Sequence, residues 1–155
     1  MHRRNLLGAL KRYAQRHPDE QPTVDRFNRL LEDHPNCFER DCWAGHITGS
    51  AWLLDPSQSK LLLTHHRKLN MWLQLGGHSD GDPDTAAVAK REAQEESGLP
   101  VTLVSTEIFD IDVHAIPARK EDPQPEHFDV RFQLVAQRED FVVSPESIDL
   151  AWVPL

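Results

Sequence analysis

The chain has 155 residues, a hydrophobic fraction of 39% and a formal net charge of −8. This length is typical of one domain with one core, and the excess of acidic residues argues against a nonspecific nucleic-acid binder, which would present a basic face. The sequence holds no long apolar run that would predict a transmembrane helix, and its amphipathic N-terminus does not have the pattern of a signal peptide. Two cysteines, Cys37 and Cys42, favour a reduced, cytoplasmic protein.

Two amphipathic helices are predicted at the N-terminus. Apolar residues recur at helical spacing over residues 3–16, and a second apolar stripe follows Thr23, which we expect to cap a helix that ends before Pro35. We interpret residues 1–35 as a helical extension of a single domain, 1–155, whose core is residues 45–155. The extension would cover an edge of the core; a dimer contact and a lid over the substrate are the alternatives.

From residue 45 onward the apolar pattern alternates, as in β-strands. Strands are predicted at 47–53, 61–64, 71–75, within 101–113, at 127–134 and at 150–153, with a hairpin joining the first two and a polar loop at 115–125. This order predicts an α+β domain with one helix against a mostly antiparallel sheet. Four aromatic residues are expected in the core, although one of them could stack on a base: Trp43, Trp52, Trp72 and Phe109.

The stretch 76–99, GGHSDGDPDTAAVAKREAQEESGL, contains the predicted helix, at 83–97. Asp82 would cap it, Pro83 would occupy its first position, and Gly98 would end it. Its alanines would lie against the sheet, while the other side points acidic residues outward. Like charges three and four residues apart destabilise a helix, and a hard divalent cation such as Mg²⁺ or Mn²⁺ would reverse that effect. The outward set is Asp84, Val88, Arg91, Glu92, Glu95 and Glu96.

Residues Gly77–Leu99 closely resemble the Nudix box, G-x5-E-x7-R-E-U-x-E-E-x-G-U, in which U is aliphatic. Gly77 opens the pattern, and residues 91–99, REAQEESGL, close it in register. Pro83 stands where the family has its first glutamate, and Asp82 or Asp84 could replace that carboxylate. The resemblance implies an α/β/α sandwich around a mixed sheet. It also implies metal-dependent hydrolysis of a diphosphate linkage in a nucleoside diphosphate derivative, by attack of water on phosphorus.

The resemblance also implies roles for individual residues. The carboxylates of Glu92, Glu95 and Glu96, with the carbonyl of Gly76, would bind Mg²⁺ or Mn²⁺, and Arg91 would orient the glutamates. Glu95, Glu96 and Arg91 are therefore the candidate catalytic residues. The general base varies within the family, so a box glutamate and three later acids are open for this role: Glu126, Asp129 and Glu146.

Five residues are candidates for substrate binding. Gly77 and His78 lie in the box, where they could touch phosphate. The other three, His127, Asp129 and Arg131, share one face of a predicted strand, which is either a substrate wall or a solvated sheet face. The spacing of the nine histidines matches no zinc signature, so surface or structural roles are expected for them.

Other readings of the same residues stay open. A Nudix-like regulator that binds a nucleotide without turnover is favoured by Pro83, whereas the three intact glutamates argue against it. An activity like that of isopentenyl-diphosphate isomerase is disfavoured because no cysteine lies near the box. Nudix domains usually continue into another helix on the sheet, so we expect either a shortened chain, or that the N-terminal helices or a second subunit of a homodimer cover that face. A membrane partner and a stable nucleic-acid complex are not expected.

Overall fold

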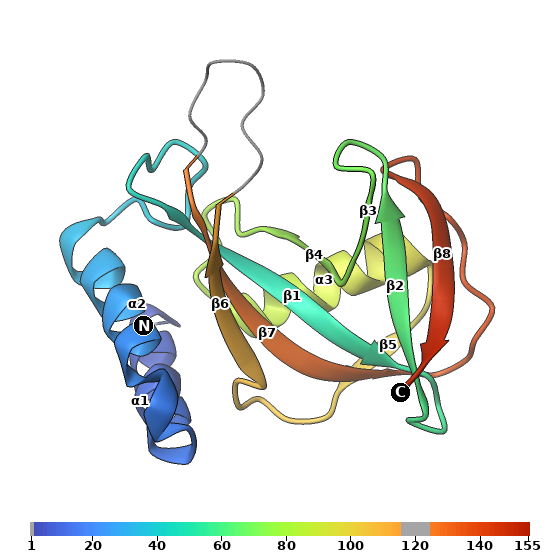
Figure 1. Cartoon of the computed structure of the whole chain (residues 1–155), viewed down its shortest axis with the longest axis horizontal. Coiled ribbons are helices and arrows are strands. Elements are labelled where there is room, and N and C mark those ends of the chain that lie inside the picture. The colour runs from blue at the N-terminus through green and yellow to red at the C-terminus, as the bar shows by residue number, and fades with distance from the viewer. Residues whose placement is uncertain (1, 116–124) are drawn as a thin grey trace.

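The computed structural model describes residues 2–115 and 125–155. The predicted loop at 115–125 lies almost entirely outside the described residues. Over the described residues the helices flank one large sheet (Figure 1). The elements are α1 (His2–Arg16), η1 (Pro18–Glu20), α2 (Gln21–Asp33), β1 (His46–Leu54), β2 (Lys60–His66), β3 (Met71–Leu73), β4 (Leu75–His78), α3 (Thr85–Ser97), β5 (Val101–Leu103), β6 (Asp110–His114), β7 (His127–Ala136) and β8 (Ser147–Pro154).

The sheet is mixed. Its central strands, β1 and β7, run parallel over nine paired positions, while every other pairing between described strands is antiparallel. The strand order is β3-β2-β1-β7-β5, with β4 on β1, β6 on β7 and β8 on β2. The mixed α+β fold is therefore confirmed. The predicted hairpin is reduced to one pair, Leu54 with Leu61, because β2 pairs along its length with β8 instead.

The main core lies on one face of β1 and β7. Residues paired across strands share a face, so Ile47 of β1 and Phe128 of β7 point the same way. On this face α3 approaches closely: a β-carbon at Gly49 would lie 2.9 Å from Cγ1 of Val88. The second helix contacts the same face, because the Phe27 ring meets the Phe128 ring edge-on at 5.2 Å. The alternation predicted for 127–134 is confirmed, with Phe128, Val130, Phe132 and Leu134 all buried.

Two predicted helix starts are wrong, one by two residues and the other by three. The third helix begins at Thr85 rather than at Pro83, because the carboxylate of Asp84, not Asp82, caps it by accepting from the Ala87 N–H at 3.2 Å. Its end at Gly98 is confirmed by a left-handed backbone with φ of 69°. The second helix begins before Thr23, and a proline stands in its first turn.

The prediction that four aromatic residues lie in the core is wrong for three of them. Trp43 is 74% exposed because it lies in the irregular segment between α2 and β1. Trp72 is also exposed: it lies on β3, a three-residue strand at the end of the sheet, where it stacks on His65. Phe109 is exposed beside the half-buried Trp52, with the two ring centroids 5.5 Å apart. Short edge elements leave one side of an aromatic ring without protein to cover it.

Both cysteines, Cys37 and Cys42, are free thiols in the core. In the part of the chain that the structure describes, no helix has the length and apolar character needed to cross a membrane. The homodimer and the cytoplasmic location stay predictions.

Candidate active site

The acidic residues of α3 lie against the glycines of β4. The Glu96 carboxylate accepts a hydrogen bond from the backbone N–H of Gly76 at 3.2 Å. The Glu92 carboxylate lies over Gly77, where a β-carbon would come within 2.7 Å of its Cδ atom. The missing side chain of Gly77 therefore makes the room that the Glu92 carboxylate occupies, and the backbone of Gly76 binds Glu96. We call Glu92, Glu95 and Glu96 the acidic cluster.

The acidic cluster does not point uniformly outward, as the helical wheel predicted. Glu96 is only 7% exposed, Glu92 is largely buried, and only Glu95 projects into solvent. Val88, assigned to the same outward side, is fully buried. The prediction is wrong because the wheel assumed that the sheet contacts only the alanine side. The missing side chain of Gly77 lets a second side of the helix come close to the β4 backbone.

Burial makes the ionised form of this cluster costly. Burial, with the neighbouring charge of Glu92 as the second cause, raises the pKa of Glu96 from its ordinary 4.5 to about 8. Burial also raises the pKa of Glu92, followed by repulsion from Glu95. The backbone N–H of Gly76 lowers the pKa of Glu96 and Arg91 lowers that of Glu92, but these effects offset only part of the rise. A proton or a cation would relieve the repulsion.

Arg91 connects the acidic cluster to β4. Its guanidinium donates to the backbone carbonyl of His78 at 3.3 Å and lies 3.5 Å from the Glu92 carboxylate. Near Pro83, both candidate replacement carboxylates make local contacts. Asp84 caps α3, and Asp82 accepts from the Asp84 N–H at 2.9 Å.

The three later acids that could act as a general base lie in different places. Glu146 is exposed, and its negative charge raises the pKa of both Glu92 and Glu96. Glu126 forms a 3.0 Å ion pair with Arg26 of α2. Asp129 lies on the face of the sheet opposite to the one that α3 covers. Glu146 is therefore the later acid that the structure associates with the acidic cluster.

Asp129 and Arg131 belong to a buried polar network on that opposite face. Asp129 is 4% exposed and accepts from the hydroxyls of Thr48 at 2.8 Å and Ser50 at 2.7 Å. The Arg131 guanidinium donates to Asp129 at 3.1 Å and to Asp110 at 2.9 Å. The predicted shared face of His127, Asp129 and Arg131 is present, but the last two bind mainly each other and their neighbours. Their roles toward a substrate stay predictions.

His78 and His127 are brought together with a third residue, His46, which the sequence did not single out. Their ring centroids lie 4.7 to 5.0 Å apart. We call these three residues the imidazole cluster. It occupies the same face as Asp129, because His46 pairs with His127 in the parallel register and Thr48 pairs with His78 in the antiparallel one. Sequence spacing gives no signal for this cluster; only the register of three strands does.

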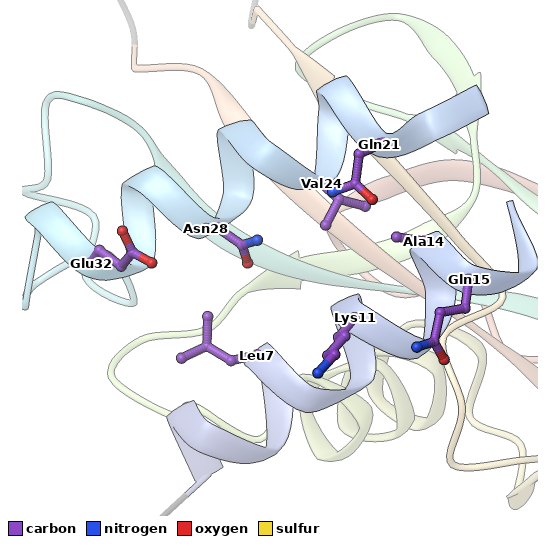
Figure 2. Close-up of a pocket in the computed structure, with 8 residues that line it drawn as sticks. All are labelled: Leu7, Lys11, Ala14, Gln15, Gln21, Val24, Asn28 and Glu32. Atoms are coloured by element: carbon purple, nitrogen blue, oxygen red, sulfur yellow. The ribbon is translucent and has the colours of Figure 1, made fainter. Parts of the chain in front are cut away.

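A groove with a volume of about 430 Å³ runs between α1 and α2 (Figure 2). Its lining comes entirely from these two helices, and it contains none of the predicted site residues. Glu32 lies at one end of it and Gln15 and Gln21 at the other, with Asn28 and Lys11 between these ends. The candidate chemistry is therefore at β4 and α3, not in this groove.

The similarity to known proteins covers more of the chain than the Nudix box alone. The model of the NUDIX domain family matches residues 46–155, from the first residue of β1 onward. A search among curated proteins found no match. The crystal structure of a NUDIX-family hydrolase from Clostridium perfringens is similar at 25% identity, over 70% of this chain and 81% of that chain, with a TM-score of 0.57.

Two further solved structures share the fold. The MutT protein from Methanosarcina mazei Go1 is 21% identical over 71% of this chain and 77% of that chain, with a TM-score of 0.54. An Ap4A hydrolase from C. elegans, solved as a binary complex, is 18% identical over 70% of this chain and 79% of that chain, with a TM-score of 0.53. With the family match over more than half of its length and the acidic cluster in the box, this chain belongs to the NUDIX domain family and is an enzyme of the Nudix pyrophosphohydrolase type.

Proposed function

We propose that this enzyme hydrolyses a diphosphate linkage in a nucleoside diphosphate derivative with the help of Mg²⁺ or Mn²⁺ at the acidic cluster. The observation that carries the proposal is the placement of the Glu92 and Glu96 carboxylates against the two glycines of β4. Ap4A hydrolase from C. elegans has the same fold, which is consistent with a substrate of this class.

The residues present fit such an ion. Carboxylate oxygens are the ligands that Mg²⁺ and Mn²⁺ prefer, and Glu92, Glu95 and Glu96 supply them with the Gly76 carbonyl as a further donor. The raised pKa values of Glu92 and Glu96 reflect crowded, partly desolvated carboxylates, which gain from a nearby cation. Bound there, the metal would neutralise the diphosphate and stabilise charge at the attacked phosphorus.

The side chains around the cluster supply the remaining functions of the proposed mechanism. Arg91 holds Glu92 in place from one side and the His78 carbonyl from the other. Glu95 is exposed and would face the substrate. Glu96 fixes the acidic cluster to β4 through its hydrogen bond with Gly76. Glu146 is our candidate to accept the proton of the attacking water. Gly77 and His78 would lie nearest the phosphates, and the candidate substrate wall, His127, Asp129 and Arg131, lies on the face of the sheet opposite to the acidic cluster.

A nucleotide-binding protein without turnover is the second candidate, and Pro83 is the observation that favours it. The carboxylate that the family carries at this position is missing, and Asp82 and Asp84 are both engaged at the start of α3. This reading predicts binding of nucleotides with no hydrolysis.

One experiment separates the two candidates. Purified protein is incubated with Mg²⁺ or Mn²⁺ and a panel of nucleoside triphosphates, nucleotide sugars and dinucleoside polyphosphates, and products are separated by chromatography. We expect metal-dependent hydrolysis of at least one member, and a rate reduced by about 10²-fold or more in Glu95→Gln.

The matched control is Glu139→Gln, which removes one exposed charge that pairs with Lys60 away from the box. It should retain the wild-type rate within about twofold. Binding without hydrolysis by the wild type would favour the regulator. Equal rates in wild type and Glu95→Gln would show that Glu95 has no part in the reaction.

A further inference from the structure

The three rings of the imidazole cluster form a triangle on the sheet. His46 begins β1, His127 begins β7, and His78 ends β4. Their ring centroids are separated by 5.0 Å (His46 to His78), 4.7 Å (His46 to His127) and 4.9 Å (His78 to His127). One potential ligand nitrogen from each ring lies within 4.8 Å of the others. The sheet register fixes this triangle, because residues paired across strands point to the same face.

Several nitrogens of the triangle have no protein partner. His46 is 4% exposed, and both of its ring nitrogens are buried without a hydrogen bond to any described residue. The Nε2 atom of His127 is also buried and has no hydrogen bond to any described residue. Buried polar atoms are rarely left unpaired in folded proteins, so three such atoms in one triangle indicate a bound group. None of the aspartates and glutamates of the box contributes to this triangle.

We propose that His46, His78 and His127 bind a divalent transition ion of the Zn²⁺ type, on the face of the sheet opposite to the acidic cluster. Zn²⁺ accepts imidazole nitrogens at about 2.0–2.1 Å in a tetrahedral arrangement, which separates the nitrogens by about 3.3 Å. The nitrogens lie within 4.8 Å of one another, so binding requires the rings to move closer together around the ion. Three nitrogen ligands leave a fourth position for water or a substrate oxygen, whereas Mg²⁺ prefers an all-oxygen site.

The charge environment suits a ligand set of neutral rings. Burial lowers the pKa of His78 to about 4 and that of His127 to about 3, and it also lowers the pKa of His46. Neutral imidazole is the form that binds metals. The positive charge of Arg40 would repel a cation here. Arg40 is paired with Asp80 at 2.8 Å, however, and the negative charge of Asp80 would attract the cation.

His114 lies at the margin of the cluster. Its ring centroid is 5.6 Å from that of His127, and its Nδ1 atom is 3.1 Å from the Asp112 carboxylate. It is exposed and outside the triangle, so we do not include it among the ligands.

Cobalt spectroscopy of the full chain tests the site directly. Co²⁺ replaces Zn²⁺ in such sites and absorbs strongly in the visible range when it is four-coordinate. After treatment with a chelator, we expect one equivalent of Co²⁺ to give these bands and one equivalent of Zn²⁺ to displace them. His127→Gln should weaken binding at least about a hundredfold, since losing a direct ligand should cost at least as much as losing a supporting residue. The control His17→Gln removes an exposed histidine of the α1 end and should bind normally.

A second pair of variants separates this proposal from the proposed function. Glu96→Gln should bind Co²⁺ as the wild type does, even if it is inactive with Mg²⁺. His78→Gln gives a second test of the ligand set in case His127→Gln does not fold. Absence of the bands in folded wild type, or their persistence in a folded histidine variant, would overturn the proposal. Loss of the bands in Glu96→Gln would do the same, because it would place the ion at the acidic cluster.

Discussion

The two sides of β4 gather their polar groups in different ways. On one side the acidic cluster lies within about one and a half turns of a single helix, so its spacing is visible in the sequence. On the other side the imidazole cluster comes from three strands, with residues 46, 78 and 127 far apart in the chain. The first group is crowded with negative charge and the second consists of neutral rings. The comparison teaches that local sequence patterns reveal helical sites, whereas a site built across a sheet depends on register.

The largest expected effect is on the acidic side. Glu96→Gln keeps the shape of the side chain but removes the charge next to Gly76. We expect kcat with Mg²⁺ to fall by about 10²–10³-fold, the range seen when one electrostatic group of an active site is removed. Steady-state kinetics on the best substrate of the panel measures it. Glu107→Gln, an exposed partner of Arg12, is the control, and a similar fall in that variant would contradict a specific role for Glu96.

The next effect concerns stability on the imidazole side. Asp129→Ala leaves Arg131 and the hydroxyls of Thr48 and Ser50 without their shared acceptor. We expect the free energy of unfolding to fall by about 3 kcal/mol, because two buried hydroxyls lose their acceptor and Arg131 keeps only the more exposed Asp110 and Asp112 as partners. Denaturant unfolding followed by circular dichroism gives the value. Glu126→Ala, which breaks an exposed ion pair, should cost less than about 1 kcal/mol, and equal losses would sink the idea of a special buried network.

A smaller effect tests the contact between β4 and α3. Gly77→Ala adds a β-carbon that would lie 2.7 Å from Glu92 Cδ, and the flexible glutamate side chain can move aside. We expect little change in melting temperature but a kcat about 10- to 100-fold lower, because the carboxylate is displaced. Gly8→Ala is the matched control, since its β-carbon would meet only Arg12 Nη1 at 3.4 Å. Unchanged kcat in Gly77→Ala would argue that the position of Glu92 does not matter.

The smallest effect is a pH dependence of the metal-free protein. Because burial raises the pKa of Glu96 to about 8 from 4.5, the folded state holds a proton that the unfolded state releases between these values. Stability should therefore be highest below pH 4.5 as far as this group is concerned, and its contribution should decline as pH rises toward 8. Melting temperatures measured in a chelator should show the decline by a few degrees.

Two additions sharpen this test. Mg²⁺ should raise the melting temperature more at pH 8 than at pH 5, because it competes with the proton for the same carboxylates. Glu96→Gln should flatten the pH profile, since an amide does not titrate in this range. A profile that is unchanged in Glu96→Gln would assign the effect to other groups.

Much of the fold and the acidic half of the site could be predicted from the sequence. The alternation over 127–134 and the glycine at 98 are local signals, and both match the structure. The box glutamates could be identified, but their direction could not. A helical wheel shows which side chains share a side, whereas the absence of a side chain at Gly77 allows Glu92 to approach the sheet.

The remaining features depend on long-range pairing. His46 joins His127 only through the parallel register of β1 and β7, and no spacing rule connects positions so far apart. The exposure of Trp72 follows from the place of β3 at the end of the sheet, which its own three residues do not reveal. The propensity of a segment predicts that a strand or helix forms, but the elements packed around it decide whether its side chains are buried.

Three consecutive residues of β4 link the ligands on its two sides. Gly76 and Gly77 hold the glutamates, while the next residue, His78, gives its ring to the imidazole cluster and its carbonyl to Arg91. One backbone segment thus positions both groups. If an ion on one side shifts this segment, it changes affinity on the other side. Thermodynamic linkage then requires that the factor be the same in both directions.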